Sequence, residues 1–207
     1  MSATDPVPAR EERVAAIILA AGSSRRMGEN KLLLNFLGAS LLLRATNNAL
    51  GALLVPVVVV VGFEEERMRR ELQGLPVEIV TNPDYGGPSS LSMHAALRAL
   101  PDDVAGALVI LPDMPVVSSE MLRDVKAAAK NVPQSPLVAS RYGDVTAPPI
   151  LFRRALFDEL LAWSGEGCGK PVVKEHAHEA VYLDWPPEAL EDVDTPEDFA
   201  RISARHA

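Results

Sequence analysis

The stretch that decides the fold is VAAIILAAGSSRRMGENK, Val14 to Lys31, in which an unbroken apolar run passes directly into a glycine loop. The run VAAIILA is typical of a strand that is covered on both faces, as in a parallel sheet. The loop that follows carries Arg25, Arg26 and Lys31. Positive charge after a buried strand predicts an anionic ligand, although the loop alone leaves a solvated basic turn open.

The rest of the chain repeats this strand-and-helix pattern. Further strands are predicted at 55–62, 77–82, 106–113 and 136–141, and helices at 40–50, 64–73, 89–100 and 118–130. The alternation favours a doubly wound α/β fold with helices on both faces of a mostly parallel sheet. After these come a short strand leading into a helix at 147–163 and a helix at 195–205, which Thr195 caps. We expect a flexible leader at 1–12 and a single domain at 13–207.

Composition limits the possible partners. The 207 residues include 20 basic and 28 acidic side chains, a net charge of −8 that disfavours nucleic acid and anionic membranes. No apolar run approaches the ~20 residues that cross a bilayer, and the N-terminus has no signal-peptide core. The lone Cys168 fits a reducing compartment. We therefore expect a cytoplasmic protein.

Two acidic positions are candidate metal ligands. Asp113 follows an apolar strand in LPDMP, and Asp194 lies in EDVDTPED before the last predicted helix. Mg²⁺ binds proteins through one or two carboxylates and completes its octahedron with water and phosphate. A helix-capping role for Asp113 is the alternative, and Asp192 is interpreted only as a charge that favours the start of the helix.

The loop NPDYGGPSS and the helix after it form a second candidate binding segment. N–H groups at a helix start can hold an anion or the edge of a base, and Ser89, Ser90 and Ser92 add hydroxyl groups. Capping accounts for at least one of these serines. His94, in the same helix, is interpreted as structural or phosphate-facing.

Histidine and cysteine give weaker signals. His176 and His178 have a spacing that separates them on a helix, which makes a metal site there improbable. Cys168 lies in the glycine-rich GEGCGK and would contact substrate or donate to a soft metal, although a lone cysteine usually does neither.

Taken together, these motifs resemble the MobA-like nucleotidyltransferases. LAAGSSRRMGENK is similar to the family signature LAAGxSxRMGxxK, and its LAAG form resembles the cytidylyltransferase branch rather than the guanylyl branch with LAGG. NPDYGGPSSLSMHAAL, LPDMP, PPILFRRALFDELLAWSGEGCGK and DVDTPEDF follow in family order over nearly the whole chain.

The resemblance implies a three-layer α/β/α Rossmann-like nucleotidyltransferase fold and a set of site residues. Asp113 and Asp194 would bind Mg²⁺, and Arg26, Lys31 and Asp113 would be catalytic. The nucleotide-binding residues would be Leu19, Ala20, Ala21, Gly22, Ser23, Ser24, Arg25, Arg26, Gly28, Lys31, Asn82, Ser90 and Ser92.

The chain also departs from the family pattern. Pro112 replaces the usual glycine before the PDMP aspartate, Pro149 replaces a histidine, and His94 stands where a basic residue follows SSL. The family's GDxGAR has become GEGCGK, with Glu166, Cys168 and Lys170. These differences concern mainly the side where the second substrate should bind.

A mechanism follows from charge. A phosphate-monoester acceptor has a second pKa near ~6 and needs no general base at neutral pH. Mg²⁺ held by Asp113 and Asp194 would bridge the α-phosphate, and Arg26 and Lys31 would stabilise the departing pyrophosphate.

The predicted function is Mg²⁺-dependent transfer of CMP from CTP to molybdopterin, with an apo molybdenum hydroxylase as a further partner. One alternative is nucleotide transfer to another phosphorylated small molecule, such as a sugar or polyol phosphate. Another is a non-catalytic cofactor carrier or insertion chaperone. An oxidoreductase is a minor alternative, since GxGxxG is absent.

Overall fold

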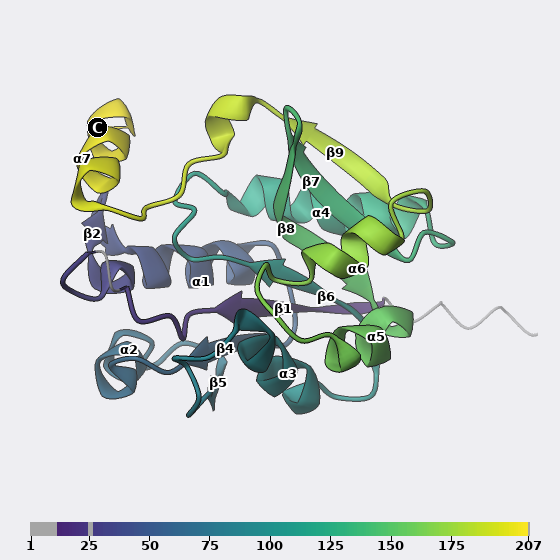
Figure 1. The fold of residues 1–207 in the computed structure, drawn as a ribbon, viewed down its shortest axis with the longest axis horizontal. Coiled ribbons are helices and arrows are strands. Elements are labelled where there is room, and N and C mark those ends of the chain that lie inside the picture. The colour runs from purple at the N-terminus through teal and green to yellow at the C-terminus, as the bar shows by residue number, and fades with distance from the viewer. Residues whose placement is uncertain (1–11, 25–26, 207) are drawn as a thin grey trace, which may run out of the picture.

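The computed structural model describes residues 12–24 and 27–206, and its centre is a seven-stranded sheet (Figure 1). The predicted leader therefore lies, apart from Glu12, outside the described residues, as do Arg25 and Arg26. The order in the sheet is β5-β4-β1-β6-β8-β7-β9, and the other two strands, β2 and β3, form a small antiparallel hairpin. The strands are β1 (Arg13–Leu19), β2 (Asn35–Phe36), β3 (Ala39–Ser40), β4 (Val57–Val61), β5 (Glu78–Thr81), β6 (Val104–Ile110), β7 (Leu137–Tyr142), β8 (Val145–Arg153) and β9 (Val181–Trp185).

Only β8 runs against its neighbours in the central sheet, because it pairs antiparallel with both β6 and β7. β1 pairs parallel with β4 and β6, β4 with β5, and β7 with β9. The prediction of a mostly parallel sheet is confirmed. The sequence pattern did not identify β9, β2 or β3, and it made β8 too short.

Helices cover both faces of the sheet. The α-helices are α1 (Leu41–Gly51), α2 (Glu65–Glu71), α3 (Ser89–Ala99), α4 (Ser119–Asn131), α5 (Phe157–Ala162), α6 (Lys170–Glu175) and α7 (Pro196–His206). Short 3₁₀ helices occupy Lys31–Leu33, Arg154–Leu156 and Pro187–Ala189. Apolar residues of α1, α2 and α4 pack on one face of the sheet and those of α3, α5 and α6 on the other, which gives the predicted three layers.

The valine-rich strands divide their side chains between these two layers. Along β4, Val57, Val59 and Val61 face the α1 side, whereas Val58 and Val60 face the α3 side. All five are at least 98% buried, as expected for a strand whose successive side chains point to opposite covered faces. Burying each adds about 1.5–3 kcal/mol of hydrophobic stabilisation.

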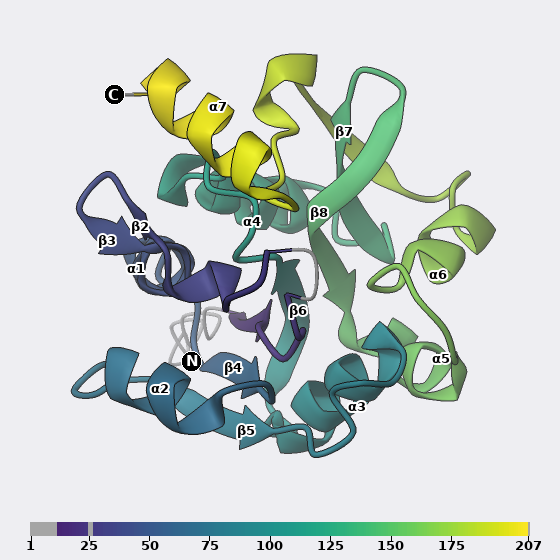
Figure 2. The ribbon, with the colours of Figure 1, turned by 60° about the vertical axis from the view of Figure 1, so that its left-hand side comes forward.

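The last helix, α7, lies apart from these layers, beside the β2–β3 hairpin (Figure 2). Ile202 of α7 packs with Phe36 and Val193 in a small separate cluster, and Phe199 contacts Phe36 edge-on. The predicted cap is present, because the Thr195 hydroxyl accepts from the Asp198 N–H at 3.2 Å. α7 therefore fixes the chain segment that precedes it, Leu190–Asp194, against the body of the protein.

In the part of the chain that the structure describes, none of the helices has the length and apolar character needed to cross a membrane.

Candidate functional site

The loops after β1 and β6 meet at one end of the sheet. Since β1 and β6 are parallel neighbours, their carboxyl ends lie side by side, which is where open α/β sheets bind ligands. A cleft of about 320 Å³ opens there. Its lining residues are Leu19, Gly22, Ser23, Ser24, Lys31, Leu32, Leu111, Pro112, Asp113 and Asp194.

Three charged side chains converge in this cleft. The Lys31 Nζ lies 2.8 Å from Asp113 Oδ2 and 3.0 Å from Asp194 Oδ1, so the amino group bridges the two carboxylates. Lys31 is 14% exposed, Asp113 22% and Asp194 32%. Asp113 lies 82 residues and Asp194 163 residues after Lys31 in the sequence, and the fold brings all three side chains together.

The protonation of Lys31 follows from these contacts. Burial by itself lowers the pKa of the amino group, but the ion pairs with Asp113 and Asp194 outweigh burial and raise the pKa above the ordinary 10.5. The lysine is therefore a fixed positive charge at neutral pH. It occupies the space between two carboxylates that a cation of another kind would also fill.

The glycine loop is held by its own side chains. The Ser24 hydroxyl accepts from the Lys31 N–H at 3.2 Å, and the Asn30 side chain accepts from the Leu32 N–H at 3.1 Å, which starts the short helix that carries Lys31. Gly28 has a φ of 73°, a conformation that L side chains rarely adopt. A Cβ at Gly22 would meet nothing within 4 Å, which leaves open space above its backbone.

The carboxylates suit a divalent cation. Oδ1 of Asp113 is buried and has no hydrogen-bond partner among the described residues. A buried carboxylate oxygen of this kind costs free energy unless a ligand or ion satisfies it. Within residues 12–24 and 27–206, no three His, Cys, Asp or Glu side chains gather as metal ligands. Two carboxylates with water and phosphate oxygens are, however, a typical Mg²⁺ environment.

The structure places the polar residues at the start of α3 in a separate network. The Asn82 amide donates to the Ser92 hydroxyl at 2.9 Å, and both residues are buried. The Ser90 hydroxyl accepts from the Gly165 N–H at 3.1 Å, and the Ser89 N–H donates to a Glu166 carboxylate oxygen at 3.1 Å. The anion at this helix start is thus the chain's own carboxylate, a partner that the sequence analysis did not anticipate.

The histidines and the cysteine that the sequence analysis considered lie among other groups of the protein, outside the lining of the cleft. The His94 Nε2 lies 3.0 Å and 2.9 Å from the carbonyl oxygens of Leu160 and Trp163, so this histidine ties α3 to the end of α5. Burial, reinforced by the negative charge of Asp113, raises the pKa of the Cys168 thiol to about 11. His176 pairs with Glu159 at 2.8 Å, whereas His178 lies 3.1 Å from Glu179.

Of the residues predicted from sequence, the cleft brings together Leu19, Gly22, Ser23, Ser24, Lys31, Asp113 and Asp194. Ala20 and Ala21 are buried and do not line the cleft. Asn82, Ser90 and Ser92 do not line it, and their assignment to the nucleotide stays a prediction. Arg25 and Arg26 lie outside the described residues. Leu32 and Leu111 line the cleft without having been predicted, since apolar residues beside a motif carry no chemical signal. Pro112, noted as a departure from the family pattern, also lines it.

A family model, the MobA-like NTP transferase domain, matches residues 16–181. The chain belongs to the MobA-like NTP transferase family. The resemblance drawn from the motifs is therefore confirmed, and so is nucleotidyl transfer as the general activity. The matched residues include Lys31 and Asp113 but end before Asp194.

The proteins to which the chain is similar have several different functions. The chain is 29% identical to the purine catabolism protein PucB of Bacillus subtilis, over 93% of this chain and 97% of PucB. It is 31% identical to the molybdenum cofactor guanylyltransferase of Rhodobacter capsulatus, over 93% and 96%. The molybdenum cofactor cytidylyltransferase of Escherichia coli is 24% identical, over 93% and 97%.

The fold of this MobA-like transferase is shared with solved structures. The crystal structure of Rv0371c from Mycobacterium tuberculosis superposes with a TM-score of 0.83 at 24% identity, covering 93% of this chain and 98% of that one. This likeness supports the Rossmann-like α/β/α fold.

Proposed function

We propose that this MobA-like transferase moves CMP from CTP to the phosphate of molybdopterin, with Mg²⁺ as cofactor and pyrophosphate as the second product. The observation that carries the proposal is the Lys31 amino group between Asp113 and Asp194, in a cleft lined by the glycine loop. An anion-binding loop and a paired-carboxylate cation site in one cleft fit a nucleoside triphosphate and its metal. A cofactor carrier would need neither.

Asp113 and Asp194 would hold Mg²⁺, and the buried, unpaired Oδ1 of Asp113 is the natural first ligand. Bound there, the ion would screen the α-phosphate and make it a better electrophile. On this proposal, Lys31 leaves the carboxylates when metal and nucleotide enter, and its amino group turns to the pyrophosphate end of the triphosphate. There it stabilises the charge that develops on the leaving group.

The acceptor phosphate attacks the α-phosphorus, and the bond to the pyrophosphate oxygen breaks. A dianionic acceptor needs no proton removed, so the chain's groups act by orientation and charge. Open space above Gly22 lets phosphate oxygens approach backbone N–H groups of the loop. The segment Gly165–Lys170 docks on α3 through Ser89 and Ser90 and forms the proposed acceptor side.

The choice of base has two candidates. The LAAG form at Leu19–Gly22 favours CTP. The greater identity with a guanylyltransferase, 31% against 24% for a cytidylyltransferase, favours GTP. Transfer to a different phosphorylated acceptor is the second candidate function, favoured by the unusual GEGCGK sequence on the proposed acceptor side.

Pyrophosphate release with each of the four nucleoside triphosphates, with and without molybdopterin, tests the proposal. Pyrophosphate release that requires both CTP and molybdopterin supports the proposal. Release with GTP in place of CTP would make guanine the base that the enzyme selects. Release with other phosphorylated acceptors would replace molybdopterin as the second substrate. Absence of release with every combination refutes nucleotidyl transfer to these acceptors.

Substitutions test the roles that the proposal gives to Lys31 and Asp113. Lys31→Ala should slow transfer roughly 100-fold, the cost of losing one electrostatic donor to the transition state. Asp113→Asn should raise the Mg²⁺ concentration that transfer requires while the fold is retained. Lys126→Ala and Asp184→Asn are matched controls outside the cleft. Lys126 contacts the Leu53 carbonyl oxygen, and Asp184 of β9 pairs with Arg141 of β7.

A further inference from the structure

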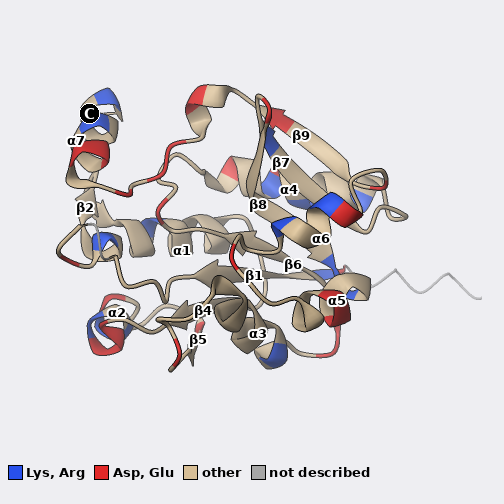
Figure 3. Ribbon diagram, in the orientation of Figure 1, with Lys and Arg blue, Asp and Glu red and all other residues tan. Residues whose placement is uncertain are grey.

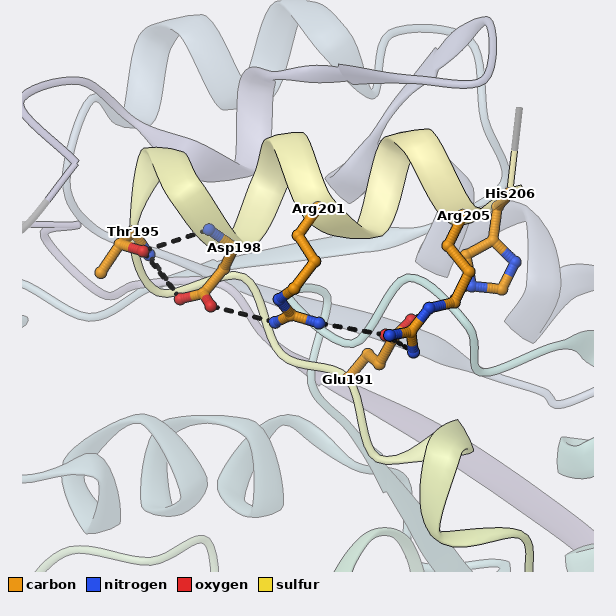
Figure 4. A network of polar contacts seen from close by, with 6 residues as sticks. All are labelled: Glu191, Thr195, Asp198, Arg201, Arg205 and His206. Carbon is orange, nitrogen blue, oxygen red and sulfur yellow. Dashed lines mark hydrogen bonds and ion pairs between the residues drawn. The ribbon is translucent and has the colours of Figure 1, made fainter.

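The loop that carries Asp194 is attached to α7 by a buried carboxylate. Glu191 is only 4% exposed and accepts from Arg201 Nη1 at 3.2 Å, from Arg205, and from His206 Nε2 at 3.1 Å (Figure 4). Arg201 also donates to Asp198 at 3.0 Å, which links the Glu191 carboxylate to the cap of α7. Figure 3 shows acidic residues along the segment before α7 and basic residues at the far end of the helix.

Burial alternates along this loop. Glu191 and Val193 are buried, whereas Asp192 is exposed and Asp194 partly exposed. Val193 packs with Phe36 and Ile202 in the cluster beneath α7. Glu191 and Val193 therefore face α7, and the alternation turns Asp194 the other way, toward Lys31.

The same loop is attached directly to the other carboxylate. The Val193 N–H donates to the Asp113 carbonyl oxygen at 2.9 Å, so the backbones that carry Asp113 and Asp194 are joined next to the cleft. The Glu191 ion pairs attach the loop to α7, and the hydrogen bond from Val193 attaches it to the segment that carries Asp113. The Val193 side chain, packed with Phe36 and Ile202, and the contact of the Asp194 carboxylate with Lys31 hold the same segment further along.

We infer that Glu191 is a positioning residue for the cation site. Its ion pairs with Arg201 and Arg205 fix the loop so that the Asp194 carboxylate stays beside the Lys31 amino group that it shares with Asp113. The inference rests on the proposed function, because it takes the two carboxylates as the Mg²⁺ site. Removing a group that orients a metal ligand typically lowers the affinity for the metal by about 10–100-fold.

The test is Glu191→Gln, which keeps the shape of the side chain and removes its charge. Two quantities are measured: the exchange rate of the Val193 amide proton, and the dependence of pyrophosphate release on Mg²⁺ with the best substrate pair. We expect Val193 exchange to rise, the half-saturating Mg²⁺ concentration to rise roughly 10-fold, and turnover at saturating Mg²⁺ to be retained.

Two further variants keep the test decisive. The double variant Arg201→Gln/Arg205→Gln removes the same ion pairs from the α7 side and should reproduce the Mg²⁺ shift if Glu191→Gln does not fold. Glu64→Gln is the matched control, because Glu64 pairs with Arg67 on α2 and should change neither quantity.

The outcomes separate this inference from the proposed function. An active wild type together with a normal Mg²⁺ requirement in Glu191→Gln, or in the double variant, overturns the role of Glu191 and leaves the proposed function standing. A wild type that releases no pyrophosphate overturns the proposed function, and unchanged Val193 exchange would then also overturn the claim that Glu191 fixes the loop. Lower turnover with an unchanged Mg²⁺ requirement indicates a merely structural role and refutes the inference.

Discussion

Replacement of Lys31 by methionine tests whether the two carboxylates form a cation site. The amino group lies 2.8 Å and 3.0 Å from Asp113 and Asp194, and its removal leaves two negative groups facing one another. Breaking a fully buried pair costs about 3–5 kcal/mol and an exposed pair about 0–1 kcal/mol. With side chains that are 14%, 22% and 32% exposed, we expect Lys31→Met to lower the free energy of unfolding by about 2 kcal/mol.

A divalent cation should restore part of this loss. If the carboxylates, freed of the lysine, bind Mg²⁺ with a Kd of about 1 mM, then about 10 mM Mg²⁺ stabilises the variant by roughly 1.4 kcal/mol. The wild type should gain less, because Lys31 already occupies the space between the carboxylates. Lys31→Arg keeps the charge and should behave like the wild type, and Lys126→Met is the control for losing a lysine elsewhere.

Urea unfolding with and without Mg²⁺, without nucleotide, measures these differences. The sign of the pH dependence is also fixed: the raised pKa of Lys31 means that its stabilising contribution is present below pH 10.5 and is lost as the pH rises through the folded-state pKa. The measurements are therefore made at neutral pH. If Lys31→Met is as stable as the wild type, or if Mg²⁺ stabilises both equally, the carboxylates are not a cation site that the lysine fills.

Three further substitutions or modifications test the cleft and its surroundings. Gly22→Ala should change the free energy of unfolding by no more than about 0.5 kcal/mol, since a Cβ there meets nothing within 4 Å. Because the added methyl group fills part of the cleft, the KM for the nucleotide should rise roughly 10-fold. An unchanged KM would show that the phosphates bind elsewhere. Gly62→Ala should lower the free energy of unfolding by about 1–3 kcal/mol, because its Cβ would lie 2.4 Å from that of Tyr85; thermal unfolding at wild-type temperature would contradict this. Alkylation of Cys168 at pH 8 should be roughly 10-fold slower than that of a thiol with the ordinary pKa of 9.0, because the pKa of Cys168 is raised to about 11; the thiolate fraction falls about 100-fold, and the greater nucleophilicity of the more basic thiolate offsets part of this loss. The rate should rise about tenfold per pH unit up to pH 10, and labelling at the rate of an ordinary thiol would contradict the raised pKa.

Local sequence determined the layers of this protein and most of its elements. β4 contains a run of five valines, and only a strand covered on both faces buries all of them, so Val57–Val61 could be predicted without any partner. The opposite direction of β8 could not, because direction depends on the neighbours β6 and β7. The segment Val181–Trp185 lies at the edge of the sheet and is only partly buried, so it lacks the apolar run that marks the central strands.

The sequence also determined the chemistry of the site, because the glycine loop, the basic residue Lys31 and the carboxylates of Asp113 and Asp194 each stand in a recognisable motif. Only the tertiary structure decided that these residues meet, with Lys31 between two carboxylates that lie 82 and 163 residues further along the chain. It alone placed Glu191 beneath α7, since a single glutamate before a helix carries no signal until the folded chain surrounds it with Arg201 and Arg205. Residue types set which interactions are possible, and packing of distant segments sets which of them are made.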